Sequence, residues 1–486
     1  MAAAIRWQND SAHRRIWGGV LLLALIRLVW IGDESFIHEE AKFIHMALDA
    51  NERGDWLTLG NMGKMGARYG PATVWFYRAL LAITHDIYMV AALSTATITS
   101  LTLIGLRWLA RSTRLHPMSL IPVMLSPYLF YYSRKIWDGP FTSPLILISF
   151  STYLLFLETR KTVFLFLAFL CASFALQFHL MALAFVAPLC LHFLFFEARW
   201  AWKNKLKLAI PFVVLLGVSA PYGLYLLQVV GTSSGFVGGW TDLHYAFLGA
   251  RYYTTFEFSY VIGDGWQAFK AIPWRFSQLI IAMSALTWLA FPISWFGAFH
   301  SAKIVKDGFR WNERLDLRVH ASLLAWATFG FHAAQSVHSG LRNHPNYYSG
   351  AWIAALYFLM LGITELWSRR WFRRAFAIYC AALAVFFATI IVKVHVNHGT
   401  RNMQYGPTLS NQDAVARQLN RYLNDAPLAP TALSPKIFPH AIGALRRLDD
   451  GPRNSLYEGT FDIRYATDDW RDGSIEIWPQ PWREED

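Results

Sequence analysis

The stretch Pro140–Leu157 reads PFTSPLILISFSTYLLFL, and after a short basic link Val163–Gln177 reads VFLFLAFLCASFALQ. Each is an apolar run close to the length that an α-helix needs to cross the hydrocarbon core of a bilayer. A third run, Leu180–Phe196, follows after only Phe178 and His179. Consecutive runs of this kind, joined by links too short for a domain, predict a bundle of helices inside a membrane.

The same pattern extends outward over most of the chain, of which 55% of residues are hydrophobic and 16% charged. We expect about eleven transmembrane helices, so the predicted fold class is an all-α polytopic membrane protein. The remaining expected spans are Ile16–Ile31, Ile87–Ala110, Pro117–Tyr132, Leu208–Val230, Ser277–Phe299, Val319–Ser336, Tyr348–Trp367 and Ala375–Lys393.

The net charge of +12 is typical of a nucleic-acid binder, but the cations lie in the short links between spans. If the N-terminus is cytoplasmic, every inner loop is basic, as the positive-inside rule requires. The inner cations are Arg111 and Arg114, Arg160 and Lys161, Lys203 to Lys207, Lys303 to Arg318, and Arg369 to Arg374. The Asn-x-Ser/Thr acceptor at Asn9 is also on the inner side, which favours a bacterial inner membrane.

The tail, residues 394–486, has a different composition from the transmembrane domain, residues 1–393. It holds 10 Lys and Arg against 13 Asp and Glu, and it contains no run long enough to span a bilayer. A helix capped by Asn411 or Ser410 is expected to end near Leu423. Strand-like stretches run over Tyr457–Tyr465 and Ser474–Trp478. We therefore predict a small α+β module in the periplasm.

The first outer loop holds two adjacent acids, Glu39 and Glu40, at the start of an amphipathic helix. Ala41, Ile44 and Leu48 recur there at helical spacing, so the helix can lie along the membrane surface. The positive end of the helix dipole favours carboxylates in its first turn. The acids are therefore candidates for acid–base chemistry, although simple helix capping explains them too.

The stretch Gly60–Pro71, GNMGKMGARYGP, follows in the same loop. Its glycines free backbone amides, and Lys64 and Arg68 add two cations, a combination that suits a phosphate. A solvated turn fits the same composition, and the spacing of a P-loop is absent. A second amphipathic helix is expected over Ala72–Thr84.

The second outer loop contains Arg134, Lys135 and Asp138. An Asp at the mouth of a span is costly unless it faces water or a partner, so Asp138 is a functional candidate. Either neighbouring cation could instead simply pair with it. Three further outer segments mix polar and aromatic residues that suit sugar stacking and phosphate pairing, and equally suit an interfacial belt. They contribute the candidates His179, Arg251, Arg342 and Tyr347.

At these positions the chain resembles the GT-C superfamily of polyprenyl-phosphate-sugar-dependent glycosyltransferases, in the branch of protein O-mannosyltransferases and aminoarabinose transferases. That branch carries an acidic pair followed by Ala in a long first outer loop, an Arg and a downstream Asp in the second, and several intervening motifs. The matching residues, in order, are Glu39-Glu40-Ala41, Gly54-Asp55-Trp56-Leu57, Gly70-Pro71, Trp75-Phe76-Tyr77, Arg134 and Asp138. Glu39 departs from the pattern, because the first acid is usually Asp; Asp33-Glu34 is the other possible pair.

The resemblance implies a GT-C-like membrane domain that moves a sugar from a lipid phosphate to an acceptor hydroxyl on a lipid, glycan or protein. The implied catalytic residues are Glu39, Glu40 and Asp138, with Glu39 as the base. The donor phosphate would meet Lys64, Arg68, Arg134 and Arg342, and Tyr69, His179, Arg251 and Tyr347 would contact substrate. We expect no required cofactor; the carboxylates could hold a divalent metal, but no ligand cluster demands one.

A multi-pass transporter or flippase is the alternative function. Transport predicts charged residues inside the spans and repeated or broken helices, and the spans here are nearly free of charge. The sequence therefore favours an enzyme that works beside membrane lipids and binds no nucleic acid.

Overall fold

The computed structural model describes residues 11–36, 38–57, 59–62, 67–230, 288–310, 315–339 and 348–396, and in the tail residues 399, 408–423, 441, 444–445, 448, 461–465 and 475–479. Five helices in this part are long and apolar enough to cross a membrane. They are α5 (Ile87–Thr113), α8 (Gly139–Thr159), α10 (Leu183–Lys203) with the preceding turn η4 (Leu180–Ala182), α11 (Lys205–Val230) and α18 (Arg370–Val396). The chain is therefore an integral membrane protein.

Other helices fall within or close to the expected stretches. These helices are α2 (Ser11–Leu25), α3 (His38–Arg53), α4 (Ala72–Ile83), α9 (Thr162–Phe178), α15 (Ala290–Gly308), α16 (Leu317–Ser339) and α17 (Trp352–Leu366). Three of the seven, α4, α9 and α17, are shorter apolar helices. Both amphipathic helices expected in the first outer loop are present, as α3 and α4. Of the expected span Ser277–Phe299, residues 277–287 lie outside the described part.

The stretch Pro117–Tyr132, expected as one uninterrupted helix, is broken into short pieces. These are η3 (Pro117–Ser119), α6 (Leu120–Met124) and α7 (Pro127–Ser133). Ser126, between the last two, has extended backbone angles of φ −62° and ψ 122°. The physical cause is Pro127, because a proline disfavours the helical conformation of the residue before it and has no N–H to continue the ladder.

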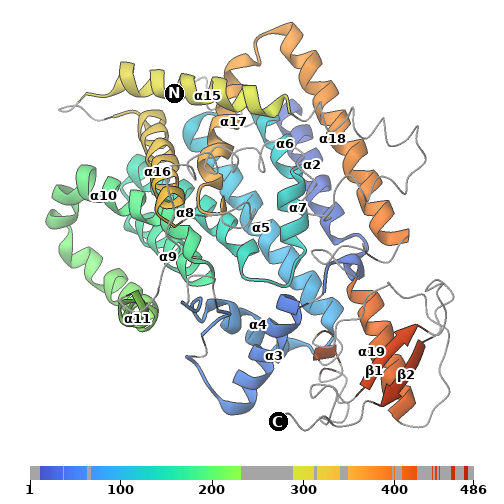
Figure 1. Cartoon of the computed structure of the whole chain (residues 1–486). Coiled ribbons are helices and arrows are strands. Elements are labelled where there is room, and N and C mark those ends of the chain that lie inside the picture. The colour runs from blue at the N-terminus through green and yellow to red at the C-terminus, as the bar shows by residue number, and fades with distance from the viewer. Residues whose placement is uncertain are drawn as a thin grey trace.

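Helix α8 is the centre of the bundle, since every residue from Gly139 to Leu157 is buried. It packs against α5 on one side and α9 on another. Gly105 of α5 allows this approach, because a Cβ there would lie 2.6 Å from the Leu147 side chain. Figure 1 shows α8 surrounded by other helices, so its first residues are held firmly in place.

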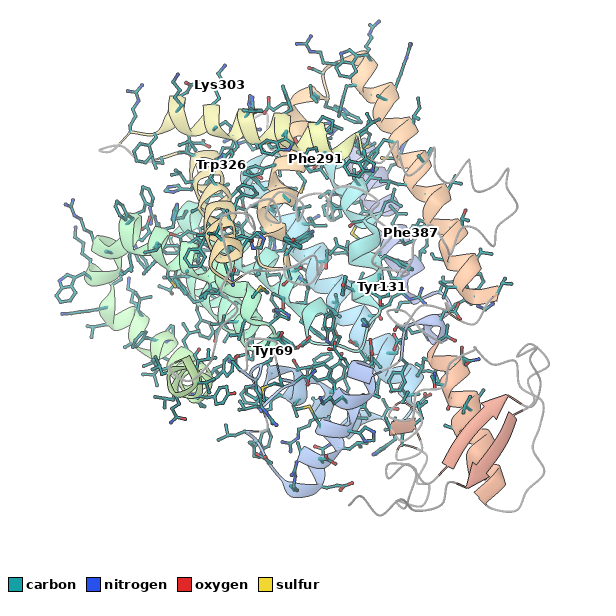
Figure 2. The ribbon with its side chains drawn as sticks, in the orientation of Figure 1. Tyr69, Tyr131, Phe291, Lys303, Trp326 and Phe387 are labelled. Carbon is teal, nitrogen blue, oxygen red and sulfur yellow. The ribbon has the colours of Figure 1, made fainter. Side chains whose placement is uncertain are left out.

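The bundle has two ends, which we call the α3–α4 end and the opposite end. Helices α3 and α4 lie across one end, at the bottom of Figure 1, and α15 crosses the opposite end. Figure 2 shows the same separation, with Tyr69 at the α3–α4 end and Lys303 on α15 at the opposite end.

The tail contacts the start of the first loop. Helix α19 (Leu409–Leu423) begins where the Leu409 N–H donates to the Glu34 carbonyl at 2.9 Å. The Tyr88 hydroxyl of α5 donates to Asp413 at 2.8 Å. Strands β1 (Phe461–Tyr465) and β2 (Ile475–Pro479) form an antiparallel pair. The strands lie within one residue of the expected stretches, whereas α19 begins at Leu409, before the Ser410 or Asn411 that was expected to cap it.

Candidate functional site

Helix α3 presents its two acids in different environments. Glu39 and Glu40 occupy the first turn, where the helix dipole favours negative charge. Adjacent residues on a helix point about 100° apart, so one acid can face the bundle and the other solvent. Glu40 is fully buried, on the same side as the buried Ala41 and Ile44, whereas Glu39 is exposed.

Lys135 forms an ion pair with the buried acid. Its Nζ lies 2.6 Å from Oε1 of Glu40, and it also lies 4.9 Å from the ring centroid of Trp137. Burial lowers the pKa of Lys135 to about 8, against the opposing charges of Glu39, Asp138 and Glu34. Lys135 was weighed in the sequence only as a partner for Asp138; the structure instead pairs it with Glu40.

Asp138 is the N-cap of α8, and its Oδ1 accepts the Gly139 N–H at 2.7 Å. Asp is a preferred N-cap residue, and Pro140 is tolerated in the first turn because no helix partner awaits its missing N–H. Asp138 is fully buried, and within the described part of the chain its Oδ2 has no hydrogen bond. Burial, followed by the charge of Glu39, raises the pKa of Asp138 well above its usual range.

Glu34 is a further buried acid, and it belongs to Asp33-Glu34, the alternative to the predicted acidic pair Glu39-Glu40. It is 2% exposed, and neither carboxylate oxygen has a hydrogen bond among the described residues. Burial raises its pKa, while the charges of Arg134 and Lys135 oppose that shift. The signal that could have found it is the one that identified Asp138, an acid at the mouth of a span. We call Glu34, Glu39, Glu40 and Asp138 the carboxylate cluster.

Arg134, expected at the donor phosphate, is engaged with the protein. Its Nη2 donates to the Trp30 carbonyl, and its guanidinium lies 5.0 Å from the Phe130 ring centroid. Trp30 adopts a left-handed backbone, with φ 50°, and stacks on His395 of α18. Arg134 is also buried, so these contacts indicate that it holds the end of α2 against α7 and neutralises part of the carboxylate cluster.

The loop before α4 lies against the ends of α9 and α11. The Gly70 N–H donates to the Gln177 carbonyl at 2.8 Å, and a Cβ at Gly70 would lie only 2.7–2.9 Å from Gln177 atoms. Only glycine allows this approach without displacing the backbone. The Tyr69 ring consequently stacks on His179 with centroids 4.7 Å apart. Two of the predicted substrate contacts are thus neighbours.

Arg68 has a fixed backbone and an exposed side chain. Its N–H donates to the Tyr225 hydroxyl at 2.9 Å, and its carbonyl accepts from the Tyr222 hydroxyl at 3.0 Å. Tyr222 in turn lies within electrostatic reach of Asp138. The two tyrosines of α11 therefore hold this cation close to the carboxylate cluster.

The other predicted site residues, Lys64, Arg251, Arg342 and Tyr347, lie outside the described part of the chain. Among the residues that the structure describes, no three His, Cys, Asp or Glu side chains are arranged to hold a metal ion. What the structure brings together is thus the three predicted catalytic acids, Lys135, and a cationic loop beside them.

The fold is similar to that of ArnT. The chain is similar to the solved structure of ArnT from Cupriavidus metallidurans in the apo state, with a TM-score of 0.50 and 13% identity over 88% of this chain and 84% of that one. ArnT from the same organism bound to undecaprenyl phosphate gives a TM-score of 0.48 and 15% identity over 89% and 84%. No protein-family profile matches the chain. No curated protein matches it either.

Proposed function

We propose that this protein is a membrane glycosyltransferase that moves a sugar from a polyprenyl-phosphate-linked donor to an acceptor hydroxyl on the periplasmic side of a bacterial inner membrane. One observation carries the proposal. Glu39 and Asp138, from loops about a hundred residues apart, lie close enough for the charge of Glu39 to raise the pKa of Asp138. Perturbed acids gathered beside cations are typical of catalytic sites.

The sidedness of the cluster supports the periplasmic assignment. The loops at the end opposite α3 and α4 include the basic links around Arg111, Arg160 and Lys203. Basic loops remain in the cytoplasm, so α3, α4 and the carboxylate cluster would face the periplasm. The tail helix α19 contacts that same end, and we assign the tail to the periplasm with it.

The reaction we propose is a single displacement. Glu39, the exposed acid, takes the proton of the acceptor hydroxyl. The hydroxyl oxygen then forms a bond to the anomeric carbon while the bond from that carbon to the phosphate oxygen breaks. The configuration at the carbon inverts, and polyprenyl phosphate leaves with the electron pair. The proton remains on Glu39 until solvent removes it.

Cations stabilise the charge that develops on the leaving phosphate. Lys135 and Arg68 are the candidates that the structure describes, and Lys64 and Arg342 remain predictions. Glu40 holds Lys135 in place. Asp138 lies beside Glu39, whose charge raises the pKa of Asp138. The acceptor class, a lipid A, another envelope glycan or a protein, follows from the resemblance alone.

The test is a transfer assay with purified protein, a panel of labelled polyprenyl-phosphate sugars and extracted envelope as acceptor. Glu39→Gln should lower the transfer rate by about 10²- to 10⁴-fold, the contribution of a general base. Glu52→Gln is the matched control, since Glu52 is an exposed acid near the other end of α3. Wild-type-like turnover in Glu39→Gln would refute the assignment. Flux of a lipid-linked sugar across vesicles, without transfer, would favour a transporter.

A further inference from the structure

A buried histidine lies inside the bundle, away from the carboxylate cluster. His332 of α16 is 1% exposed, and its ring meets that of Tyr348 edge-on with centroids 5.2 Å apart. Neither of its ring nitrogens has a hydrogen bond within the described residues. A neutral imidazole carries one N–H donor and one acceptor. Burying both without partners is unfavourable, so the described residues leave His332 with polar groups that a bound ligand can satisfy.

Three other side chains, on α16, on α8 and next to Tyr348 in the chain, carry buried polar atoms that also have no hydrogen bond in the described part of the chain. Gln335, one turn along α16, donates through Nε2 to the Met181 sulfur at 3.8 Å, and its Oε1 is unpaired. The hydroxyls of Ser349 and Thr142 are unpaired as well. We call Thr142, His332, Gln335 and Ser349 the buried polar cluster.

Contacts of these residues, or of their neighbours in the chain, link the segments that carry them. The Ser143 hydroxyl, next to Thr142, donates to the Ser349 carbonyl at 3.5 Å. Residue 350 is a glycine, and a Cβ there would overlap the Met181 carbonyl oxygen. Met181 is the same residue that Gln335 contacts. The cluster thus joins α8, α16, η4 and the segment before α17.

The buried polar cluster begins one helical turn away from the carboxylate cluster. Thr142 lies one helical turn from Asp138 on α8, on the same face. Its members are uncharged and offer hydroxyl, amide and imidazole groups, which both donate and accept hydrogen bonds. Small numbers of placed polar groups in an apolar surround are typical of sites for uncharged polar ligands, and polar residues at membrane depth are commonly functional.

We propose that the buried polar cluster binds the sugar ring of the donor, a neutral polyhydroxy group, while the phosphate lies beside Lys135 and Arg68. This inference rests on the proposed function. The hydroxyls of the sugar supply the partners that Thr142, His332, Gln335 and Ser349 do not have among the described residues.

The experiment compares two ligands by the rise in melting temperature of the full-length protein in detergent. One is undecaprenyl phosphate without a sugar, and the other is undecaprenyl phosphate carrying glucose, galactose, mannose or aminoarabinose in turn. The variants are Thr142→Val, which removes a hydroxyl at nearly constant shape, and His332→Phe. Thr152→Val is the matched control, because Thr152 is buried on the same helix but donates to the Ile148 carbonyl at 2.7 Å.

We expect the wild type to bind its sugar-bearing donor more tightly than the bare lipid phosphate. Each variant of the cluster should weaken donor binding by about tenfold, the equivalent of one hydrogen bond, and leave binding of the bare lipid phosphate unchanged. The ligand-free melting temperature should not fall, because neither side chain makes a hydrogen bond to any residue that the structure describes. Thr152→Val should keep the full preference for the donor.

Two results would overturn the inference alone. One is a full preference for the donor in both Thr142→Val and His332→Phe. The other is an equal loss of binding for the donor and the bare lipid phosphate. If no sugar-bearing lipid stabilises the wild type, the proposed function fails, and the sugar site fails with it. A melting temperature that falls in both variants without ligand would assign the cluster a structural role and reject the proposal.

Discussion

The two ends of the helical bundle treat buried charge differently. At the end opposite α3 and α4, Glu197 is paired with Arg160, and Arg318 contacts both Glu365 at 3.5 Å and the Thr113 carbonyl at 3.0 Å. At the α3–α4 end, the Lys135–Glu40 ion pair lies among three further carboxylates. Two of these, Glu34 and Asp138, have unpaired oxygens in the described part of the chain.

The difference indicates what each end is for. Matched ion pairs at one end fasten helices together and leave little to react. An excess of buried carboxylate costs folding free energy, because desolvation of an unpaired ion is unfavourable. A protein retains such an arrangement where the perturbed groups do chemistry. The comparison therefore supports our proposal that the reaction takes place at the α3–α4 end, and four experiments test it.

The largest expected effect is on catalysis. Asp138→Asn should lower the rate of sugar transfer by about 10²-fold or more, because it removes a carboxyl group that the proposed reaction uses beside Glu39. Glu197→Gln, at the opposite end, should leave the rate within about twofold while it weakens the pairing with Arg160. Initial rates with the labelled donor measure both. Equal loss of rate in the two variants would remove the distinction between the ends.

The next effect is on stability. Lys135→Met should destabilise the protein by about 3–5 kcal/mol, since it leaves Glu40 buried and unpaired. Arg160→Met should cost less, because solvent reaches the Arg160 side chain, which is 35% exposed. Adding Glu40→Leu to Lys135→Met should restore most of the loss. Denaturation in detergent gives these values, and a double variant no more stable than Lys135→Met would contradict the pairing.

A pH dependence should appear at the α3–α4 end. Lys135 has a folded pKa of about 8, below its unfolded value. Between these two values the unfolded state binds more protons, so this residue makes stability rise with pH over that window and adds no slope below it. If its charge serves the leaving phosphate, activity should fall as pH rises through about 8.

Lys135→Arg tests whether Lys135 causes the fall in activity above about pH 8, because arginine stays protonated over the same range. The alkaline fall in activity should move to higher pH in this variant. Asp138 and Glu34 act in the opposite sense on stability. Their raised folded pKa values make stability highest at low pH and lower as pH rises from their unfolded values toward the folded ones. If the fall in activity occurs at the same pH in Lys135→Arg as in the wild type, another group causes that fall.

The smallest effect compares two equivalent hydrogen bonds. The Tyr225 hydroxyl accepts the Arg68 N–H at the α3–α4 end, and the Thr364 hydroxyl accepts the His116 N–H at the opposite end, each at 2.9 Å. Tyr225→Phe and Thr364→Val should each cost about 1 kcal/mol of stability. Only Tyr225→Phe should also raise KM for the donor, because it loosens the backbone of Arg68. A KM effect of equal size in Thr364→Val would argue against that role.

The parts of the site that follow one another closely in the chain were accessible from the sequence. The adjacent acids Glu39 and Glu40 were recognised from their place before Ala41, Ile44 and Leu48, which α3 now presents toward the bundle. Asp138 was recognised because an acid at the mouth of an apolar run is costly without a purpose. In each case local spacing carried the information.

Partners that are distant in the chain were not accessible. The pairing of Lys135 with Glu40, rather than with the nearby Asp138, depends on how α3 lies against α7 and α8. The contact of Arg134 with the Trp30 carbonyl, and the loss of a continuous helix over Pro117–Tyr132, depend on the end of α2 and on Pro127. The sequence predicted no role for His332, because a histidine in an apolar run has no distinctive spacing.

By itself the sequence determined that the chain is a helical membrane protein with acids and cations in its first two outer loops, because hydropathy, periodicity and charge are local properties that short windows record. Only the tertiary structure decided which acid is buried, which is exposed and which cation neutralises which carboxylate. Those outcomes depend on desolvation and on distances between residues far apart in the chain, and both exist only once the helices have packed.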